Sequence, residues 1–556
     1  MTYDLRGGTF PKLGSGGLRL VANLAEMPVL GPLLVEKLKA DGGLTGIRDA
    51  APNEAPTLFP HLGADDRPVP PLVHANTPNE PKGFRFPGLD DYHAAYRDGR
   101  TDPVAVAERF LAQHAASDAG PHPLRAMIAV QRDDLIAQAR ASAARWRAGT
   151  PLGLFDGVPV AIKDEMDVAG YPTTVGTKFI GKGEAAREDC AAAGRLRAAG
   201  AVIVGKANMH EIGINVTGLN PHWGTTRNPY NDRYHTGASS SGPATAVASG
   251  LVPVAIGADG GGSIRIPAAL CGLVGIKGTF GRVSEFGAYP LCWSLAYIGP
   301  LATSVSDCAR AYAVVAGADP RDPHSIGHPP VDLDDARPGS LAGVRLGVYW
   351  PWFRDATPEV VERSEALLRD LVARGATLVE VSIPQLEAQR VAHIVTITSE
   401  MASQMMRYLP RHRGDFGLDV RVNLAVARSW RAQEYVAAQR IRTIARAVWA
   451  SAFANVDAIV TPTTAQVAPR INEDALPHGE SDLTTSIRIM RFAFASNLTG
   501  HPAITMPAGY DREGLPVGLQ AIGRPWGERL LFRIAAAAEQ IVERRGPQRW
   551  YPTLER

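Results

Sequence analysis

The sequence has few cysteines, almost no net charge and no long apolar run. Its 556 residues include only four cysteines, without CxxC spacing, which predicts buried small side chains in a reducing compartment rather than disulfides. Lys and Arg total 58 and Asp and Glu total 56, a formal net charge of +2. Nucleic acids are bound mainly through dense positive charge, so no nucleic-acid partner is expected.

Membrane and export signals are also missing. No stretch of 18 apolar residues occurs, so no transmembrane helix is expected. The chain opens Met1-Thr-Tyr-Asp-Leu5 without an apolar segment nearby, so no secretory signal is expected. The 45% of hydrophobic residues is enough for a full core. A cytoplasmic protein is therefore predicted, with peripheral membrane contact as an added option.

What the sequence does contain is a run of three glycines that leads directly into a serine. The stretch reads Gly257-Ala-Asp-Gly-Gly-Gly-Ser-Ile-Arg-Ile-Pro267 and follows a predicted strand. Glycine lets backbone N–H groups approach a ligand closely, and a serine in such a turn presents its hydroxyl beside those donors. Acyl transfer needs this pairing of a nucleophile and an oxyanion hole. Taken alone, the stretch also fits an ordinary glycine loop.

Two more segments favour the catalytic interpretation. Val158-Pro-Val-Ala-Ile-Lys-Asp164 predicts a short buried strand that ends at Lys163, and Gly237-Ala-Ser-Ser-Ser-Gly242 is a serine-rich loop. A lysine at a strand end is most often a surface residue, but a desolvated amine can act as a base. No histidine lies in the three segments, and lysine-based variants of the serine triad exist.

In this order, the three segments resemble the amidase signature family. Carried over by position, the resemblance makes Lys163 the base, Ser239 the bridging serine, held in a cis peptide, and Ser263 the nucleophile. It places the oxyanion hole at the backbone N–H groups of Gly260, Gly261, Gly262 and Ser263. The resemblance implies hydrolysis of an amide through an acyl-enzyme, without a cofactor or a metal.

Other segments resemble the plant-type fatty acid amide hydrolases within this family, namely residues 20–31, 38–43, 428–439 and 490–497. The resemblance therefore spans nearly the whole chain. It implies a lipid-degrading homodimer that cleaves fatty acid amides such as N-acylethanolamines to the free acid and the amine. By position, Leu44, Ile214 and Val216 are expected in the wall of the acyl pocket, with ordinary core positions as the alternative.

Three positions depart from the family pattern. Ala238 and Ser241 replace glycines around the bridging serine, and Gly278 stands where the family usually has proline. An alanine at 238 is strained if its φ is positive and harmless if φ is negative. None of these changes removes a catalytic group, so they bear on rate and substrate shape rather than on reaction type.

The expected fold is α/β, an α/β/α arrangement with a mixed central sheet flanked by many helices. Residues 1–80 are predicted to form a helical leader and a proline-rich linker (56–81), and residues 81–556 the catalytic domain. Strands are expected at 158–162, 201–204, 251–256, 344–348, 377–383, 503–510 and 515–522, and helices at 104–116, 133–147, 243–250, 358–375, 433–453 and 531–544.

The leader segment from Leu18 to Leu38 is interrupted by Asn, Glu and Pro residues, so two short helices with one apolar face each are expected. Three roles stay open for them. They pack on the core, form a dimer contact, or make a cap that meets a membrane and the incoming substrate.

Metal-binding motifs are incomplete in this sequence. His210-Glu211 begins like HExxH, but position 214 is isoleucine, so no zinc pair is expected. The acidic run from Asp164 to Asp167 is expected to support Lys163 rather than bind a metal. The rival functions are a short-chain or aryl amidase, a component of a tRNA-dependent amidotransferase complex, and a non-catalytic amide-binding protein.

Overall fold

The computed structural model describes the chain except residues 1–2, 9, 51, 66, 68–81, 334–338, 477 and 556. Part of the predicted linker, 68–81, thus lies outside the described residues. The strands are β1 Met127–Ala129, β2 Pro159–Lys163, β3 Val202–Ala207, β4 Arg227–Asn228, β5 Asn231–His235, β6 Val254–Ala258, β7 Val274–Lys277, β8 Ile298–Ala302, β9 Arg345–Val348, β10 Thr377–Glu380, β11 Ala458–Pro462, β12 Ala503–Tyr510 and β13 Pro516–Gly523.

The α-helices are α1 Ser15–Ala25, α2 Leu30–Asp41, α3 Leu89–Arg97, α4 Pro103–Ser117, α5 Arg132–Arg147, α6 Ala191–Ala198, α7 Ser241–Ala248, α8 Arg265–Leu270, α9 Val305–Val315, α10 Trp350–Phe353, α11 Pro358–Ala373, α12 Leu386–Met405, α13 Leu409–His412, α14 Leu418–Ala427, α15 Ala432–Ala452, α16 Leu483–Met490, α17 Phe494–Thr499 and α18 Glu528–Glu539. Short 3-10 turns include η1 Leu44–Ile47 and η2 Glu211–Gly213.

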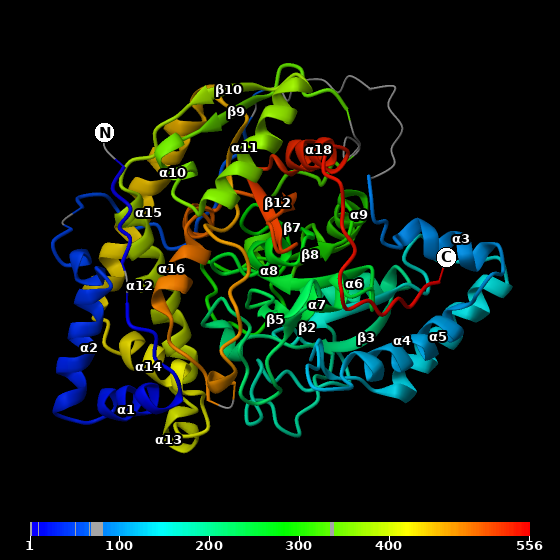
Figure 1. Ribbon diagram of the computed structural model, residues 1–556, viewed down its shortest axis with the longest axis horizontal. Helices are drawn as coiled ribbons and strands as arrows, with labels where there is room; N and C mark the ends of the chain where they lie inside the picture. The colour runs from blue at the N-terminus through cyan, green and yellow to red at the C-terminus, as the bar shows by residue number, and fades with distance from the viewer. Residues whose placement is uncertain are drawn as a thin grey trace.

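Eleven strands form one sheet in the order β1-β3-β2-β6-β8-β7-β12-β13-β11-β9-β10 (Figure 1). The sheet is mixed, because β2 runs parallel to β3 and β6 while β8 runs antiparallel to β6 and β7. Helices α6, α9, α11 and α18 pack on one face of this sheet, and α4, α5, α7 and α8 on the other. The predicted fold class is confirmed.

The alternation of side chains along each strand explains the two layers. In β2, Val160 and Ile162 lie in the core beneath α6 and α9, while Ala161 between them lies in the core beneath α5 and α7. Every residue of β2 and β6 is buried, as expected for parallel strands that are covered on both faces.

The local sequence patterns placed most elements within a few residues. The strand predicted at 503–510 is β12 with the same bounds. The last helix, predicted to end at 544, ends at Glu539. Beyond the helix, the Arg544 N–H donates to the Lys82 carbonyl at 2.8 Å, which ties residues 82–84 to the C-terminal segment.

The leader forms the two expected helices and packs against α14, at the left of Figure 1. Leu18 of α1 and Val35 of α2 are buried against Leu418 and Ala425 of α14. Across the described residues, no single helix is long and apolar enough to cross a membrane. The α1–α2 pair reaches that length only together, with a bend of 116°.

Candidate active site

The site forms where two parallel neighbours, β2 and β6, end at the same edge of the sheet. Lys163 is the last residue of β2, and the glycine run 259–263 follows β6 directly. The carboxyl ends of parallel strands are where α/β sheets present ligands. Segments nearly 100 residues apart in sequence are therefore brought together by strand pairing alone.

Lys163 is fully buried, and its Nζ has three neighbours. Nζ donates to Ser239 Oγ at 2.9 Å and to the Ala258 carbonyl at 3.2 Å, and lies 2.6 Å from Glu165 Oε2. An ammonium group has three hydrogens for these three acceptors. The neutral amine has two, which suffice for Ala258 and Glu165, and its lone pair can accept from the Ser239 hydroxyl. The Ser239 contact is thus the one that suits proton transfer in either direction.

The serine loop is held against both strands. The peptide bond between Ala238 and Ser239 is cis. The Ser240 N–H donates to the Ser263 carbonyl at 3.1 Å, and the Ser240 hydroxyl to the Ala258 carbonyl at 3.1 Å. These contacts hold the loop that carries Ser239 next to the loop that carries Ser263.

Ser263 lies at the end of the glycine run, 8% exposed, in the lining of a large cavity. Among the described residues, the backbone N–H groups of Gly260, Gly261 and Ser263 donate no hydrogen bond to another part of the protein. These N–H groups are therefore free to donate to the carbonyl oxygen of a substrate.

The Gly262 N–H is different, and here the sequence-based assignment needs correction. It donates to Asp259 Oδ1 at 2.6 Å. Because an amide has one hydrogen, that donor is already used by a carboxylate inside the protein. Gly262 is therefore removed from the predicted oxyanion hole. Its φ of +115° still requires glycine for the shape of the loop.

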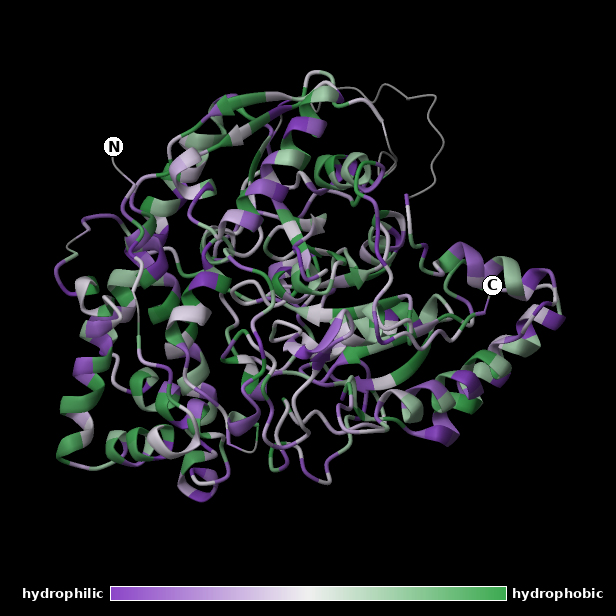
Figure 2. Ribbon diagram, in the orientation of Figure 1, coloured by the Kyte–Doolittle hydropathy of each residue, from purple (hydrophilic) through white to green (hydrophobic). Residues whose placement is uncertain are grey.

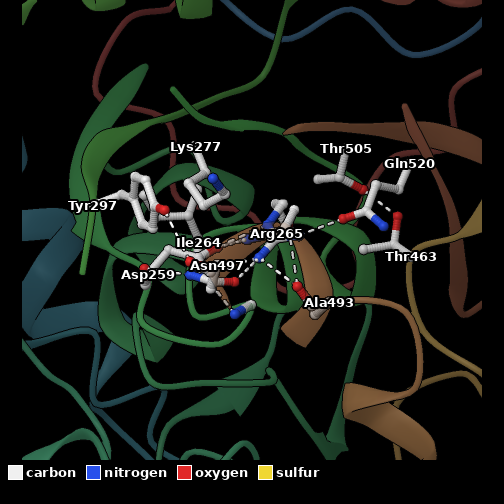
Figure 3. Close-up of polar contacts among 12 residues, drawn as sticks. Asp259, Ile264, Arg265, Lys277, Tyr297, Thr463, Ala493, Asn497, Thr505 and Gln520 are labelled. Atoms are coloured by element: carbon white, nitrogen blue, oxygen red, sulfur yellow. Dashed lines mark hydrogen bonds and ion pairs between the residues drawn. The ribbon is translucent and has the colours of Figure 1, made fainter. Parts of the chain in front are cut away.

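Asp259 is the centre of a buried network that braces the loop (Figure 3). Its carboxylate accepts from Arg265 Nε at 3.0 Å and from Asn497 Nδ2 at 2.9 Å, besides the Gly262 and Ile264 amides. Arg265 also donates to Gln520 of β13 and to Ser496 of α17. Loop, helix and strand are thereby fixed to one another around a fully buried ion pair.

The negative charge of Asp259 in this network is balanced by the positive charge of Arg265. Burial opposes ionisation of Asp259, but the Arg265 charge and the hydrogen bonds from Arg265 and Asn497 outweigh it and hold the pKa of Asp259 well below its usual range. Burial and the nearby Arg265 charge lower the pKa of Lys277, whose ammonium nitrogen lies 3.6 Å from the ring centre of Tyr297. Asp259 and Arg265 thus act as a structural pair that holds the loop.

The cavity that Ser263 faces has a volume of about 300 Å³ and mainly apolar walls. Leu44, Ile214 and Val216, the three residues predicted for the acyl pocket, all lie in its lining. One wall comes from the leader, including Leu18, Val21 and Leu38, and another from α12, including His393, Ile394, Ile397 and Met401. The leader therefore both packs on α14 and closes one side of the cavity.

Two of the departures from the family pattern have a structural explanation. Ala238 does not have a positive φ, so alanine is unstrained there. At Gly278 a Cβ atom would lie 2.0 Å from the Tyr312 hydroxyl, so this tyrosine occupies the space that a larger residue would need. Ser241 is the first residue of α7 and is buried.

Several residues in contact with the site were not singled out from the sequence. His393 of α12 lies 2.8 Å from the Gly260 carbonyl oxygen, and Asn497 and Gln520 brace the loop from the far end of the chain. Asn497 ends a segment that carried the resemblance, which is the one signal that could have marked it. Nothing local marks His393, which follows Gly260 by more than 130 residues.

Comparison with known proteins places the chain among amide-cleaving enzymes. The Amidase family matches residues 106–532. A fatty acid amide hydrolase of Arabidopsis thaliana is 37% identical over 96% of this chain and 93% of its own length. A glutamyl-tRNA(Gln) amidotransferase subunit from Symbiobacterium thermophilum is 35% identical over 80% of this chain and 94% of its own length. The crystal structure of the peptide amidase from Stenotrophomonas maltophilia superposes with a TM-score of 0.71 at 30% identity, covering 83% of this chain and 98% of that one.

Proposed function

Because the chain belongs to the amidase signature family, we propose that it hydrolyses fatty acid amides, N-acylethanolamines among them, to a free acid and an amine through an acyl-enzyme on Ser263. The observation that carries the proposal is the buried Lys163–Ser239 contact at 2.9 Å beside a serine that lines an apolar cavity.

The acylation step uses the lysine as a base. Neutral Lys163 accepts the proton of Ser239, and Ser239 accepts that of Ser263 as the Ser263 oxygen bonds to the amide carbonyl carbon. The carbonyl oxygen becomes an oxyanion and is met by the N–H groups of Gly260, Gly261 and Ser263. Preorganised donors of this kind are worth roughly 3–4 kcal/mol each in comparable enzymes.

The second half of the reaction returns the protons. An amide nitrogen leaves poorly as an anion, so the ammonium of Lys163 passes its proton back through Ser239 to the departing amine. The C–N bond then breaks and the acyl group remains on Ser263. Water attacks the ester by the same relay and releases the acid.

The cavity walls favour a long apolar acyl group. Leucine, isoleucine, valine and methionine side chains from the leader, α12 and α16 contribute much of the apolar part of the lining. Each buried methylene contributes about 0.8 kcal/mol to binding, so affinity and kcat/KM should grow with acyl length until the cavity is filled. Relatives that match nearly the whole chain include fatty acid amide hydrolases.

Hydrolysis across an N-acyl series from two to twenty carbons, with ethanolamine and an arylamine as leaving groups, tests this proposal. The expected result is a kcat/KM that rises by at least about tenfold for every two or three added methylenes before levelling off. A kcat/KM that stays flat or falls with acyl length would be consistent with the amidase chemistry but would contradict the proposal of a fatty substrate.

A variant of one cavity residue, measured with the same substrate series, tests where the acyl chain binds. Leu44→Trp should reduce kcat/KM for long acyl chains by about tenfold, because the indole takes space from the chain, and should affect the two-carbon substrate much less. Leu152→Trp is the matched control, since Leu152 is 55% exposed and is not part of the cavity lining. Equal losses at both chain lengths would argue against Leu44 as part of an acyl pocket.

We further propose that the bend between α1 and α2 meets a lipid surface from which such substrates come. Leu20, Val29 and Leu33 are 61%, 77% and 69% exposed, while Leu18, Val21 and Leu38 on the same helices line the cavity. Figure 2 shows hydrophobic positions along both helices, which lie at the edge of the molecule. An apolar face beside the cavity suits both a membrane and a lipid that enters from it.

Replacing Leu20, Val29 and Leu33 together with serine is expected to reduce binding to phosphatidylcholine vesicles by at least about tenfold, because each side chain loses apolar burial. Hydrolysis of a short, water-soluble amide should stay unchanged. The control replaces Val372 of α11 and Leu378 of β10, exposed residues outside α1 and α2, with serine. Loss of a dimer in sedimentation, with vesicle binding unaltered, would assign the face to a second copy of the chain instead.

A further inference from the structure

A histidine from α12 packs directly on the glycine run of the candidate active site. His393 is fully buried, and its Nε2 lies 2.8 Å from the carbonyl oxygen of Gly260. A Cβ built on Gly261 would lie 2.8 Å from the imidazole Cε1, so the ring is in contact with both residues. No step of the reaction described above uses this side chain.

The contact with the Gly260 carbonyl determines which nitrogen of the His393 ring carries a hydrogen. A carbonyl oxygen only accepts hydrogen bonds, so Nε2 must carry the hydrogen. Nδ1 is buried and has no partner among the described residues, which suits the neutral tautomer because a second hydrogen there would have no acceptor. Burial lowers the pKa of His393 to about 4, so the ring is neutral at physiological pH. His393 is thus a neutral donor aimed at the loop.

Because of the geometry of the peptide unit, the hydrogen bond from His393 also affects the direction of the Gly261 N–H. In a planar trans peptide, the Gly260 carbonyl and the Gly261 N–H point in opposite directions. A donor that holds the carbonyl on one side therefore also sets the direction of the N–H on the other. Three successive glycines would otherwise leave this peptide free to rotate.

The loop is anchored at both ends. Asp259 holds the Gly262 amide at 2.6 Å from one side, and His393 holds the Gly260 carbonyl from the other. The Gly261 amide lies between the two anchors. A hydrogen bond to the carbonyl of a peptide also polarises its N–H and makes it a better donor.

We propose that His393 is a positioning residue for acyl transfer, which donates to the Gly260 carbonyl and so aims the Gly261 N–H at the oxyanion. The proposal rests on the proposed function, since it assumes that an oxyanion forms at Ser263. His393 itself touches neither the attacking oxygen nor the leaving group in this account.

Two replacements separate the hydrogen bond from the shape of the ring. His393→Phe keeps an aromatic ring of similar size and removes the donor. His393→Gln keeps a donor, because its amide nitrogen stands as many bonds from Cα as Nε2 does. His393→Phe should lower kcat by about 10- to 100-fold with KM within about twofold, and His393→Gln should recover most of that loss.

A second pair of variants, His393→Asn and His393→Gln, keeps the test valid if the phenylalanine variant does not fold. His393→Asn carries the same amide as His393→Gln, but on a side chain too short to reach the Gly260 carbonyl. Asparagine should therefore behave like phenylalanine, and glutamine like the wild type. Equal kcat values for Asn and Gln variants that melt at the same temperature would overturn the proposal.

The substrate pair is a short-chain arylamide and the corresponding aryl ester. An oxyanion forms from both, so His393→Phe should slow both by the same factor. A loss confined to the amide would show that His393 moves a proton to the amine, and a rise in KM alone would show that it acts only as part of the cavity wall. Either result overturns the proposal. If Ser263→Ala hydrolyses both at the wild-type rate, the proposed function fails instead.

Discussion

Ser263→Ala is expected to abolish amide hydrolysis, with kcat reduced by at least about 10⁴-fold. Loss of the nucleophile in a comparable serine hydrolase costs about 10⁶-fold, and the oxyanion hole alone supports only a small residual rate. The replacement removes one oxygen from a residue that is 8% exposed at the cavity, so the fold should be unaffected. Steady-state turnover of a long-chain amide, with melting temperature as the check on folding, measures the effect.

The matched control is a neighbouring serine without an expected role. Ser241 lies at the start of α7, and its hydroxyl is buried without a partner among the described residues. Ser241→Ala should therefore retain kcat within a few-fold of the wild type. Clear turnover by purified Ser263→Ala protein, or equal losses in the two variants, would end the assignment of Ser263.

Lys163→Met should be nearly as damaging, with kcat lower by about 10³- to 10⁵-fold. Methionine fills much of the space of the lysine stem but has no group that can accept a proton from Ser239. The loss should be larger for an amide than for an activated ester, because only the amide needs a proton on its leaving group. Equal losses for both substrates would show that Lys163 does not return the proton.

Lys206 provides the control for this variant. It is also fully buried, on the adjacent strand β3, but its Nζ pairs with Asp164 at 3.2 Å and does not contact Ser239. Lys206→Met leaves a buried carboxylate without its partner, so it should lower the melting temperature. Its kcat should stay within about tenfold of the wild type. A loss as large as that of Lys163→Met would point to a structural cause for both.

Much of the fold could be predicted because the signals are local. Short apolar runs bounded by turn residues gave the strands at β2 and β12, and proline after a threonine gave the start of α11 at Pro358. The order of the strands could not be predicted, since β7 pairs with β12 across more than 200 residues. Non-local pairing leaves no periodic trace in a single sequence.

The site was predictable to the extent that its residues lie in motifs. Lys163, Ser239 and Ser263 each stand in a recognisable segment, and the structure brings Lys163 and Ser239 to 2.9 Å. Gly262 shows the limit of this reasoning. Sequence alone offers every amide of a glycine run as a donor, but the carboxylate of Asp259 uses this one.

The remaining contacts come from elements far away in the chain. Glu165 could be expected near Lys163 because it is two residues away, whereas its 2.6 Å contact depends on the turn after β2. His393 reaches the glycine run only because α12 packs across it. The cavity likewise combines the leader, α12 and α16, which no linear motif joins.

The most direct test of Ser263 as the acyl carrier is labelling with a long-chain alkyl fluorophosphonate, followed by mass spectrometry of the tryptic peptides. The account predicts one adduct per chain, on Ser263, that forms in step with the loss of amidase activity and does not form in Ser263→Ala. Inactivation by an adduct on any other residue, or full labelling of Ser263 with undiminished turnover, would contradict it.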